Sequence, residues 1–191
     1  GIDSADAARF AVFQVTSLST TGFVSADFEM WPTFSKLLLL LLMSIGGCAG
    51  STASGIKVAR IILLVRNARA VILQKLNPHR VVDISLGGAH VDGAMLLRVG
   101  TFFFLYLAVI FVTAFLLAMD GLLPFDAVAV AITTIGNIGP AFGIVSATST
   151  YAPLSDFSKA ILCLTMLLGR LEIFTLLILL RPSFWRKTKR W

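Results

Sequence analysis

Two short segments carry glycine among small or amide-bearing residues, in a form that could bind a cation through the backbone. They are Ser19-Thr20-Thr21-Gly22-Phe23 and Asn137-Ile138-Gly139-Pro140. A cation that crosses hydrocarbon loses its hydration shell, and rings of backbone carbonyls can replace that shell. Glycine reaches backbone conformations closed to other residues, so it lets an extended loop aim successive carbonyls inward. We predict that both segments line an ion filter, with ordinary turns as the alternative because both sequences also suit turns.

A run of small residues at positions 46–55 could form a gate. It holds four glycines and two serines in ten residues. A helix that enters the membrane near Thr33 should therefore break at mid-membrane and resume around Ile56. Non-helical backbone at that depth needs protein or water to satisfy its polar groups, so a loop there could obstruct the vestibule beneath the filter. Close helix packing through small residues is the structural alternative. The predicted gate residues in this run and just after it are Gly46, Gly47, Gly50, Ser51, Thr52, Ser54, Gly55 and Lys57.

Arg170 is a single cation within the otherwise largely apolar stretch 160–180. A guanidinium at membrane depth costs roughly 2.5 to 3.5 kcal/mol on insertion scales, so it normally faces a pore, a cavity or a protein partner. Glu172 lies two positions away, where a helix would point the two side chains apart. We therefore add Arg170 to the predicted gate, either as an electrostatic barrier to cations or as an anchor for the loop.

The elements that position these residues are those of an integral membrane protein. Hydrophobic residues make up 57% of the chain and charged residues 14%, which excludes an ordinary water-soluble domain. Residues 99–119 form an uncharged run long enough to span a bilayer. Residues 57–80 and 181–190 carry basic residues and no acid, so we place both segments in the cytoplasm. The net charge of +6 then reflects topology and contact with lipid headgroups rather than nucleic acid.

An internal repeat organises the chain. Apolar stretches 5–18 and 125–135 are too short to span the membrane and are expected to be re-entrant. Each precedes a filter segment and then a descending helix, and both descending helices open with the same triplet, Phe34-Ser35-Lys36 or Phe157-Ser158-Lys159. This alignment places Gly47 opposite Arg170. The predicted fold is all-α, with M1-P-M2 potassium-channel-like repeats, re-entrant pore helices and a broken inner helix.

The repeats suggest three segments. Residues 1–80 form one repeat that lacks its outer helix, residues 81–95 a cytoplasmic linker, and residues 96–191 a complete repeat with a single descending span at 157–180. Enzymatic function is not expected. The segment 50–57 fails as a phosphate-binding loop because Ile56 separates Gly55 from Lys57, and no nucleophile-elbow pattern is present.

Four motifs together resemble the Trk potassium transporters, the bacterial TrkH type in particular. They are the segments at 19–23, 46–57, 136–140 and Gly169-Arg170-Leu171-Glu172-Ile173-Phe174. In order along the chain they resemble the third and fourth pore repeats of that family. The resemblance implies a filter glycine at Gly22 and at Gly139, an intramembrane gating loop at 46–55, and the arginine of the fourth inner helix at Arg170.

The same resemblance implies a potassium ion as the bound species, held by filter carbonyls, and no covalently bound cofactor. It also implies a location in the bacterial inner membrane, with the filters facing outside, a homodimer of the full-length chain, and a cytoplasmic nucleotide-binding regulatory ring of the TrkA type. Two repeats would supply only part of a four-repeat pore, so we expect the chain to be part of a longer one. A non-conducting scaffold or regulatory fragment remains the alternative function, and channel and coupled symporter remain open.

Overall fold

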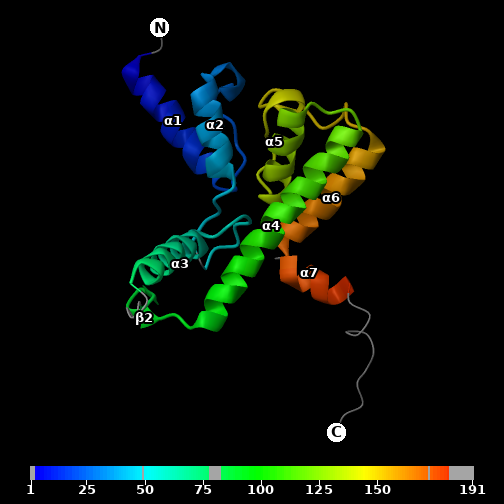
Figure 1. Ribbon diagram of the computed structural model, residues 1–191. Helices are drawn as coiled ribbons and strands as arrows, with labels where there is room; N and C mark the ends of the chain where they lie inside the picture. Colours follow the sequence, from blue (N-terminus) through cyan, green and yellow to red (C-terminus); the bar gives the residue numbers. More distant parts are fainter. Residues whose placement is uncertain (1–2, 49, 78–82, 172, 181–191) are drawn as a thin grey trace.

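The computed structural model describes residues 3–48, 50–77, 83–171 and 173–180. Figure 1 shows a helical protein built around one long diagonal helix. The α-helices are α1 (Ser4–Leu18), α2 (Thr33–Met43), α3 (Val58–Leu76), α4 (Gly93–Met119), α5 (Pro124–Ile135), α6 (Asp156–Arg170) and α7 (Ile173–Leu180). The short elements are the 3-10 turns η1 (Phe28–Met30) and η2 (Gly143–Val145) and the strands β1 (Ser85–Leu86) and β2 (Ala89–His90).

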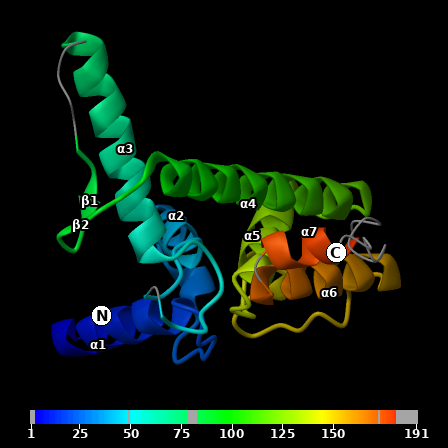
Figure 2. The same cartoon turned by 90° about the horizontal axis from the view of Figure 1, so that it is seen from below.

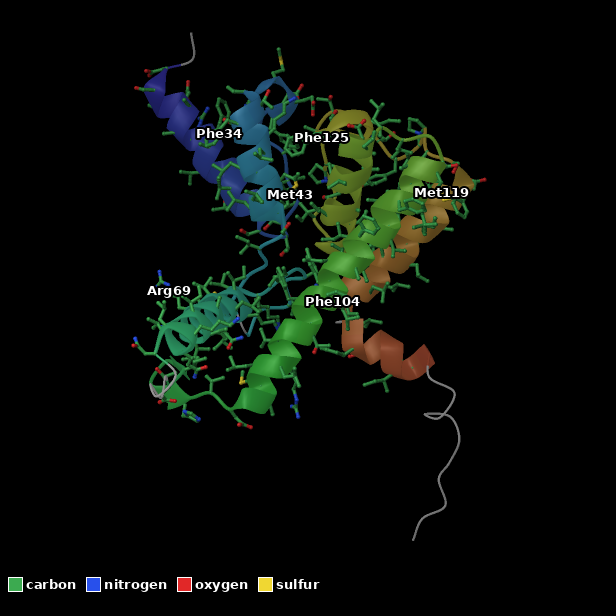
Figure 3. The ribbon with its side chains drawn as sticks, viewed as in Figure 1. Phe34, Met43, Arg69, Phe104, Met119 and Phe125 are labelled. Atoms are coloured by element: carbon green, nitrogen blue, oxygen red, sulfur yellow. The ribbon has the colours of Figure 1, made fainter. Side chains whose placement is uncertain are left out.

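Helix α4 is the one described helix that is both long and apolar enough to cross a membrane. Its 27 residues correspond to a length of about 40 Å at 1.5 Å per residue. Phe104 and Met119, labelled in Figure 3, are exposed, whereas Tyr106 and Leu117 are buried. An apolar helix with one face buried and one face exposed suits a position between protein and lipid.

Helix α5 forms the centre of the main core. It packs against both α4 and α6, and its residues Ala129, Val130 and Ala131 are fully buried. Small side chains allow the helices to approach closely, which a short buried helix requires. Across the same core, the hydroxyls of Thr113 on α4 and Thr165 on α6 lie 3.1 Å apart.

Helices α1 and α2 pair with each other and meet the rest of the molecule through α2 and α5. Figures 1 and 2 show the α1–α2 pair beside the α4–α5–α6 group. Leu39, Leu40 and Met43 of α2 belong to the same buried cluster as α5. Phe28 and Phe142 pack edge to face with ring centroids 5.1 Å apart, so the segments after α1 and after α5 also meet.

Both descending segments are interrupted. Helix α2 ends at Met43 and α3 begins at Val58, so the run of small residues is non-helical, as its composition indicates. The second segment was predicted as a single span, and that prediction is wrong. Helix α6 ends at Arg170 and α7 begins at Ile173. Neither leucine nor glutamate disfavours a helix, so residues 171–172 carry no local signal for this interruption.

A small hairpin occupies the predicted linker. Strands β1 and β2 pair antiparallel, with Ser85 opposite His90, and Gly87 and Gly88 both have positive φ. Two central residues with positive φ are typical of a tight hairpin turn, and Gly-Gly is a sequence signal for it. The Arg66 side chain on α3 donates to the Ser85 carbonyl. The hairpin is thus held against α3, and the wholly helical prediction missed it.

Candidate ion filter and gate

The first predicted filter segment leaves the end of α1 in a tight turn. The amides of Thr21 and Gly22 both donate to the Ser17 carbonyl, at 2.8 and 2.9 Å. Thr20 and Gly22 have φ of 82° and 80°. For threonine this left-handed backbone is strained, whereas glycine adopts it freely. The Ser17 hydroxyl donates to the Phe23 carbonyl, which fixes the loop against the last turn of the helix.

The second predicted filter segment leaves α5 in a similar way. The amides of Asn137 and Ile138 donate to the carbonyls of Thr134 and Thr133, at 3.1 and 3.0 Å. Asn137 and Gly139 have φ of 52° and 111°. The Thr133 hydroxyl donates to the Pro140 carbonyl at 2.8 Å. In both segments, therefore, a hydroxyl from the end of the short helix holds the carbonyl that follows a positive-φ glycine.

The two segments touch through their backbones. A Cβ placed on Gly22 would lie 2.0 Å from the Ile138 carbonyl oxygen, well inside van der Waals contact. Gly22 therefore serves both its own backbone conformation and the close approach of the other segment. Sequence analysis assigned Gly22 and Ile138 to separate filter strands, and the structure brings these two residues together.

One carbonyl of the second segment has a further partner that sequence analysis did not include. The Tyr151 hydroxyl donates to the Gly139 carbonyl oxygen at 2.5 Å. Burial raises the pKa of Tyr151 to about 12, so the hydroxyl stays protonated and able to donate at neutral pH. With Phe23 and Pro140 also held by hydroxyls, three of the predicted carbonyls already accept hydrogen bonds from the protein.

The predicted gate loop is closed at its base. Ile45 and Ile56 form a parallel bridge, in which the Gly46 amide donates to the Ile56 carbonyl at 2.9 Å and the Ile56 amide donates to the Ser44 carbonyl at 3.1 Å. A Cβ on Gly46 would lie 2.1 Å from the Ser54 carbonyl oxygen. Gly46 and Gly55 thus permit the two ends of the loop to lie against each other.

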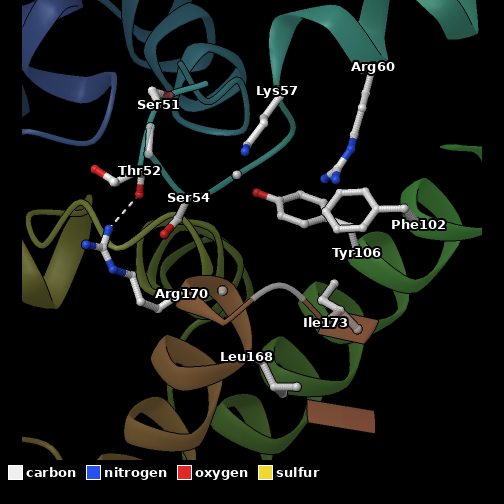
Figure 4. A pocket seen from close by; sticks show the side chains of 13 residues that line it. Ser51, Thr52, Ser54, Lys57, Arg60, Phe102, Tyr106, Leu168, Arg170 and Ile173 are labelled. Carbon is white, nitrogen blue, oxygen red and sulfur yellow. Dashed lines mark hydrogen bonds between the residues drawn. The ribbon is translucent and has the colours of Figure 1, made fainter. Parts of the chain in front are cut away.

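The predicted gate loop reaches the second repeat at two points. An Arg170 guanidinium nitrogen donates to the Thr52 carbonyl at 2.6 Å, and Figure 4 shows this bond. The Asn137 side-chain amide donates to the Ser54 hydroxyl at 3.0 Å. Arg170 ends α6 and Asn137 lies in the second filter segment, so the loop lies beneath that filter. The anchoring role considered for Arg170 therefore has a specific acceptor.

The remaining predicted gate residues differ in their surroundings. Ser51 bonds within the loop, its hydroxyl donating to the Cys48 carbonyl at 2.8 Å, and its side chain would crowd a Cβ on Gly47. Gly50 is exposed with open space around it. Lys57 directly precedes α3. Glu172, which sequence analysis set against Arg170, lies outside the described residues.

A cavity of 240 Å³ opens between the loop, α4 and the end of α6. Figure 4 shows Lys57 from the loop side and Tyr106 from α4 pointing toward it. The Arg60 guanidinium lies 4.0 Å from the centre of the Phe102 ring, an arrangement typical of a cation–π contact. Sequence analysis missed Arg60, Phe102 and Tyr106, because nothing in their local sequence distinguishes them from other helix residues.

Helix α6 approaches the short helix α5 closely at Gly169. A Cβ there would lie 2.0 Å from the Ile135 carbonyl oxygen and 2.9 Å from the side-chain amide nitrogen of Asn137. Only glycine allows this distance, which places Arg170 directly under the second filter segment. Within the described ranges, no group of three or more His, Cys, Asp or Glu side chains could hold a metal ion.

The family model for TrkH, described as a cation transport protein, matches residues 1–187. The Trk system potassium uptake protein TrkH of Salmonella typhimurium is 40% identical over 178 residues, covering 93% of this chain and 36% of that protein. The TrkH protein of Vibrio parahaemolyticus is 43% identical over 186 residues, covering 95% of this chain and 37% of that protein. The chain thus spans little more than a third of the length of these relatives.

A solved structure agrees with these matches. The crystal structure of the potassium transporter TrkH from Vibrio parahaemolyticus superimposes with a TM-score of 0.87 at 40% sequence identity. The match covers 97% of this chain and 40% of that one. The relatives are named as potassium uptake proteins, which places the chain among transport proteins rather than enzymes.

Proposed function

Because the chain belongs to the TrkH family of cation transport proteins, we propose that it supplies two repeats of a gated potassium pore. In this proposal α1 and α5 are the re-entrant pore helices, and residues 19–23 and 137–140 are filter strands. Helix α4 is the outer helix of the second repeat, and α2–α3 and α6–α7 are the interrupted inner helices. Residues 1–80, 81–95 and 96–191 then correspond to one partial repeat, a linker and one complete repeat.

The observation that carries this proposal is the matched hydrogen-bond arrangement of the two filter segments. Ser17 and Thr133 each donate to the carbonyl that follows a positive-φ glycine. Those carbonyls are turned toward the short helices, so the carbonyls before each glycine are better placed for an ion. We assign potassium to the carbonyls of Thr20 and Thr21 and of Asn137 and Ile138.

The gate belongs to the same proposal. Residues 46–55 cross beneath the second filter segment and are held there by Arg170 and Asn137. Opening requires the loop to leave both contacts. The positive charge of Arg170 at this level also raises the energy of a passing cation, so anchor and barrier act together while the loop is closed.

The proposed membrane location rests on the relatives, and the proposed orientation rests on the basic segments of the chain. The relatives are bacterial potassium uptake proteins, so we propose the bacterial inner membrane as the location and potassium as the transported ion. The basic segments 57–80 and 181–190 then lie in the cytoplasm. A homodimer of the complete transporter and a nucleotide-binding regulatory ring of the TrkA type complete the proposed assembly.

The filter proposal is tested by Gly139→Ser in the complete transporter. Gly139 has φ of 111° and open space around it, so serine would meet backbone strain without a clash. A non-glycine residue in left-handed backbone costs roughly 1–2 kcal/mol, which lowers the population of the filter conformation about tenfold. We expect a comparable fall in the preference for potassium over sodium in flux from liposomes.

Gly121→Ser is the matched control. Gly121 also has a positive φ, 98°, and open space, but it follows α4 far from the filter segments in sequence. The control should keep the wild-type preference. An unchanged preference in Gly139→Ser, with protein folded and inserted, would contradict the filter assignment and favour a non-conducting role for these repeats.

A further inference from the structure

The side chain of Asn137 connects the proposed filter directly to the proposed gate. Its amide nitrogen donates to the Ser54 hydroxyl at 3.0 Å and to the Met166 carbonyl at 3.1 Å. A side-chain amide has two N–H donors, and these two acceptors use both. One acceptor lies in the gate loop and the other in α6, whereas Asn137 itself belongs to the filter segment.

Ser54 is buried and packed within the gate loop at this contact. Ser54 is 5% exposed, and its carbonyl lies against Gly46 at the base of the loop. Thr52, two residues earlier, is held by Arg170. The loop therefore presents a buried hydroxyl to Asn137 only while it stays at its closed position. Withdrawal of the loop removes that acceptor, and the Met166 carbonyl on α6 remains.

We propose that Asn137 is a positioning residue that couples the conformation of the filter to the position of the gate loop. This inference rests on the proposed function above. In the closed state the bond to Ser54 fixes the Asn137 side chain and, through it, the backbone whose carbonyl faces the ion. In the open state the side chain loses one of its two restraints. Coupling between two sites is reciprocal, so potassium in the filter must also bias the loop.

A purely local role for Asn137, in its own backbone conformation, can be distinguished from coupling by experiment. Asparagine tolerates the left-handed backbone, here with φ of 52°, better than most residues. Asn137→Gly keeps that tolerance and removes the amide. A purely local role therefore predicts wild-type behaviour for Asn137→Gly, whereas coupling predicts the same defect as removal of the Ser54 hydroxyl.

The test uses the complete transporter with its regulatory partner in liposomes, and measures rubidium and potassium flux with and without activation. Ser54→Ala removes the acceptor, and Thr101→Ala is the matched control because its hydroxyl bonds to the Leu97 carbonyl within α4, outside the filter and gate segments. Losing one neutral hydrogen bond changes a two-state ratio about fivefold. We expect about fivefold more flux without activation in Ser54→Ala and in Asn137→Gly, no further increase in the double variant, and no increase in Thr101→Ala.

A second readout is insensitive to a general loosening of the loop. It is the potassium concentration for half-maximal flux, compared between the resting and activated states. Coupling predicts that these concentrations differ in the wild type and in Thr101→Ala, and converge in Ser54→Ala. Ser54→Thr keeps the hydroxyl and should restore the difference.

Equal concentrations in the wild type, additive effects of Ser54→Ala and Asn137→Gly, or leak of the same size in Thr101→Ala would each overturn the coupling. These outcomes are distinct from failure of the proposed function. If Gly139→Ser alters ion preference and Ser54→Ala leaves flux unchanged, the filter assignment stands and the coupling alone is wrong.

Discussion

The two interruptions of the descending segments differ in length and in use. In the first descending segment, α2 ends at Met43 and α3 begins at Val58, and the loop between them contacts Arg170 and Asn137. In the second, α6 ends at Arg170 and α7 begins at Ile173. Under the proposed function, one repeat thus supplies the movable part of the gate, and the other supplies the groups that hold it. In that proposal the duplicated elements have taken unequal roles on either side of one site.

The largest expected effect concerns the close approach that holds the second repeat together. Gly169→Ala would place a methyl 2.0 Å from the Ile135 carbonyl oxygen, and both groups are backbone-anchored. Overpacking of this kind costs typically 1–3 kcal/mol, on the order of several degrees in melting temperature. Thermal unfolding in detergent measures it. Gly100→Ala on α4, where open space surrounds the glycine, should leave the melting temperature unchanged or raise it. Equal effects of the two variants would contradict the close packing.

The next effect separates anchor from barrier at Arg170. Arg170→Ala removes both the charge and the bond to the Thr52 carbonyl. A hydrogen bond from a charged group is worth roughly 1.5–3 kcal/mol, so flux without activation should rise by about tenfold or more. Arg170→Lys keeps the charge but loses the planar fork of the guanidinium. If the bond dominates, lysine should leak nearly as much as alanine. If Arg170→Lys stays closed while Arg170→Ala leaks, the charge and not the hydrogen bond keeps the gate closed.

The smallest effect concerns the triplet shared by the two repeats. Lys36 of the first triplet pairs with Glu29 at 2.7 Å, whereas Ser158 of the second donates to Asp120 at 2.6 Å. Hydrogen bonds from Ser155 and Ser158 lower the pKa of Asp120 below its ordinary value of 3.8. A lowered pKa stabilises the folded protein above the ordinary value, and this contribution is lost as the pH falls through the lowered pKa.

Asp120→Asn should therefore melt slightly below the wild type at neutral pH, and the difference should shrink as the pH falls below about 4 and vanish below the lowered pKa. Asp156→Asn is the control, because Asp156 is exposed and pairs with the neighbouring Lys159 at 3.5 Å. Melting curves across pH measure both. A difference for Asp120→Asn that persists at acidic pH would show that the serine bonds do not depend on ionisation.

The local sequence predicted those features of the site that depend on a single residue or on one short segment. Glycine at 22 and 139 indicated backbone conformations closed to other residues, and the small residues at 46–55 indicated a break between helices. The interruption after Arg170 was missed because residues 171–172 are ordinary helix formers. The bond between Asn137 and Ser54 joins residues 83 positions apart. No sequence pattern predicts which hydroxyl a side-chain amide will meet at such a separation, since the docking of the loop under the filter decides it.

The bridge between Ile45 and Ile56 makes the gate loop a short tethered ring of chain rather than a free linker. When its tip is released, the freedom gained is limited to the residues inside the ring, because the entropy of a closed loop grows only slowly with its length. The released loop stays close to its closed position, and a loop of about ten residues can return to that position in roughly 10–100 ns. Reclosure is therefore fast compared with any rearrangement of helices. Under the proposed function, the lifetime of the open pore is then set by whatever keeps the closed position of the loop unavailable, not by the time the loop needs to return to it.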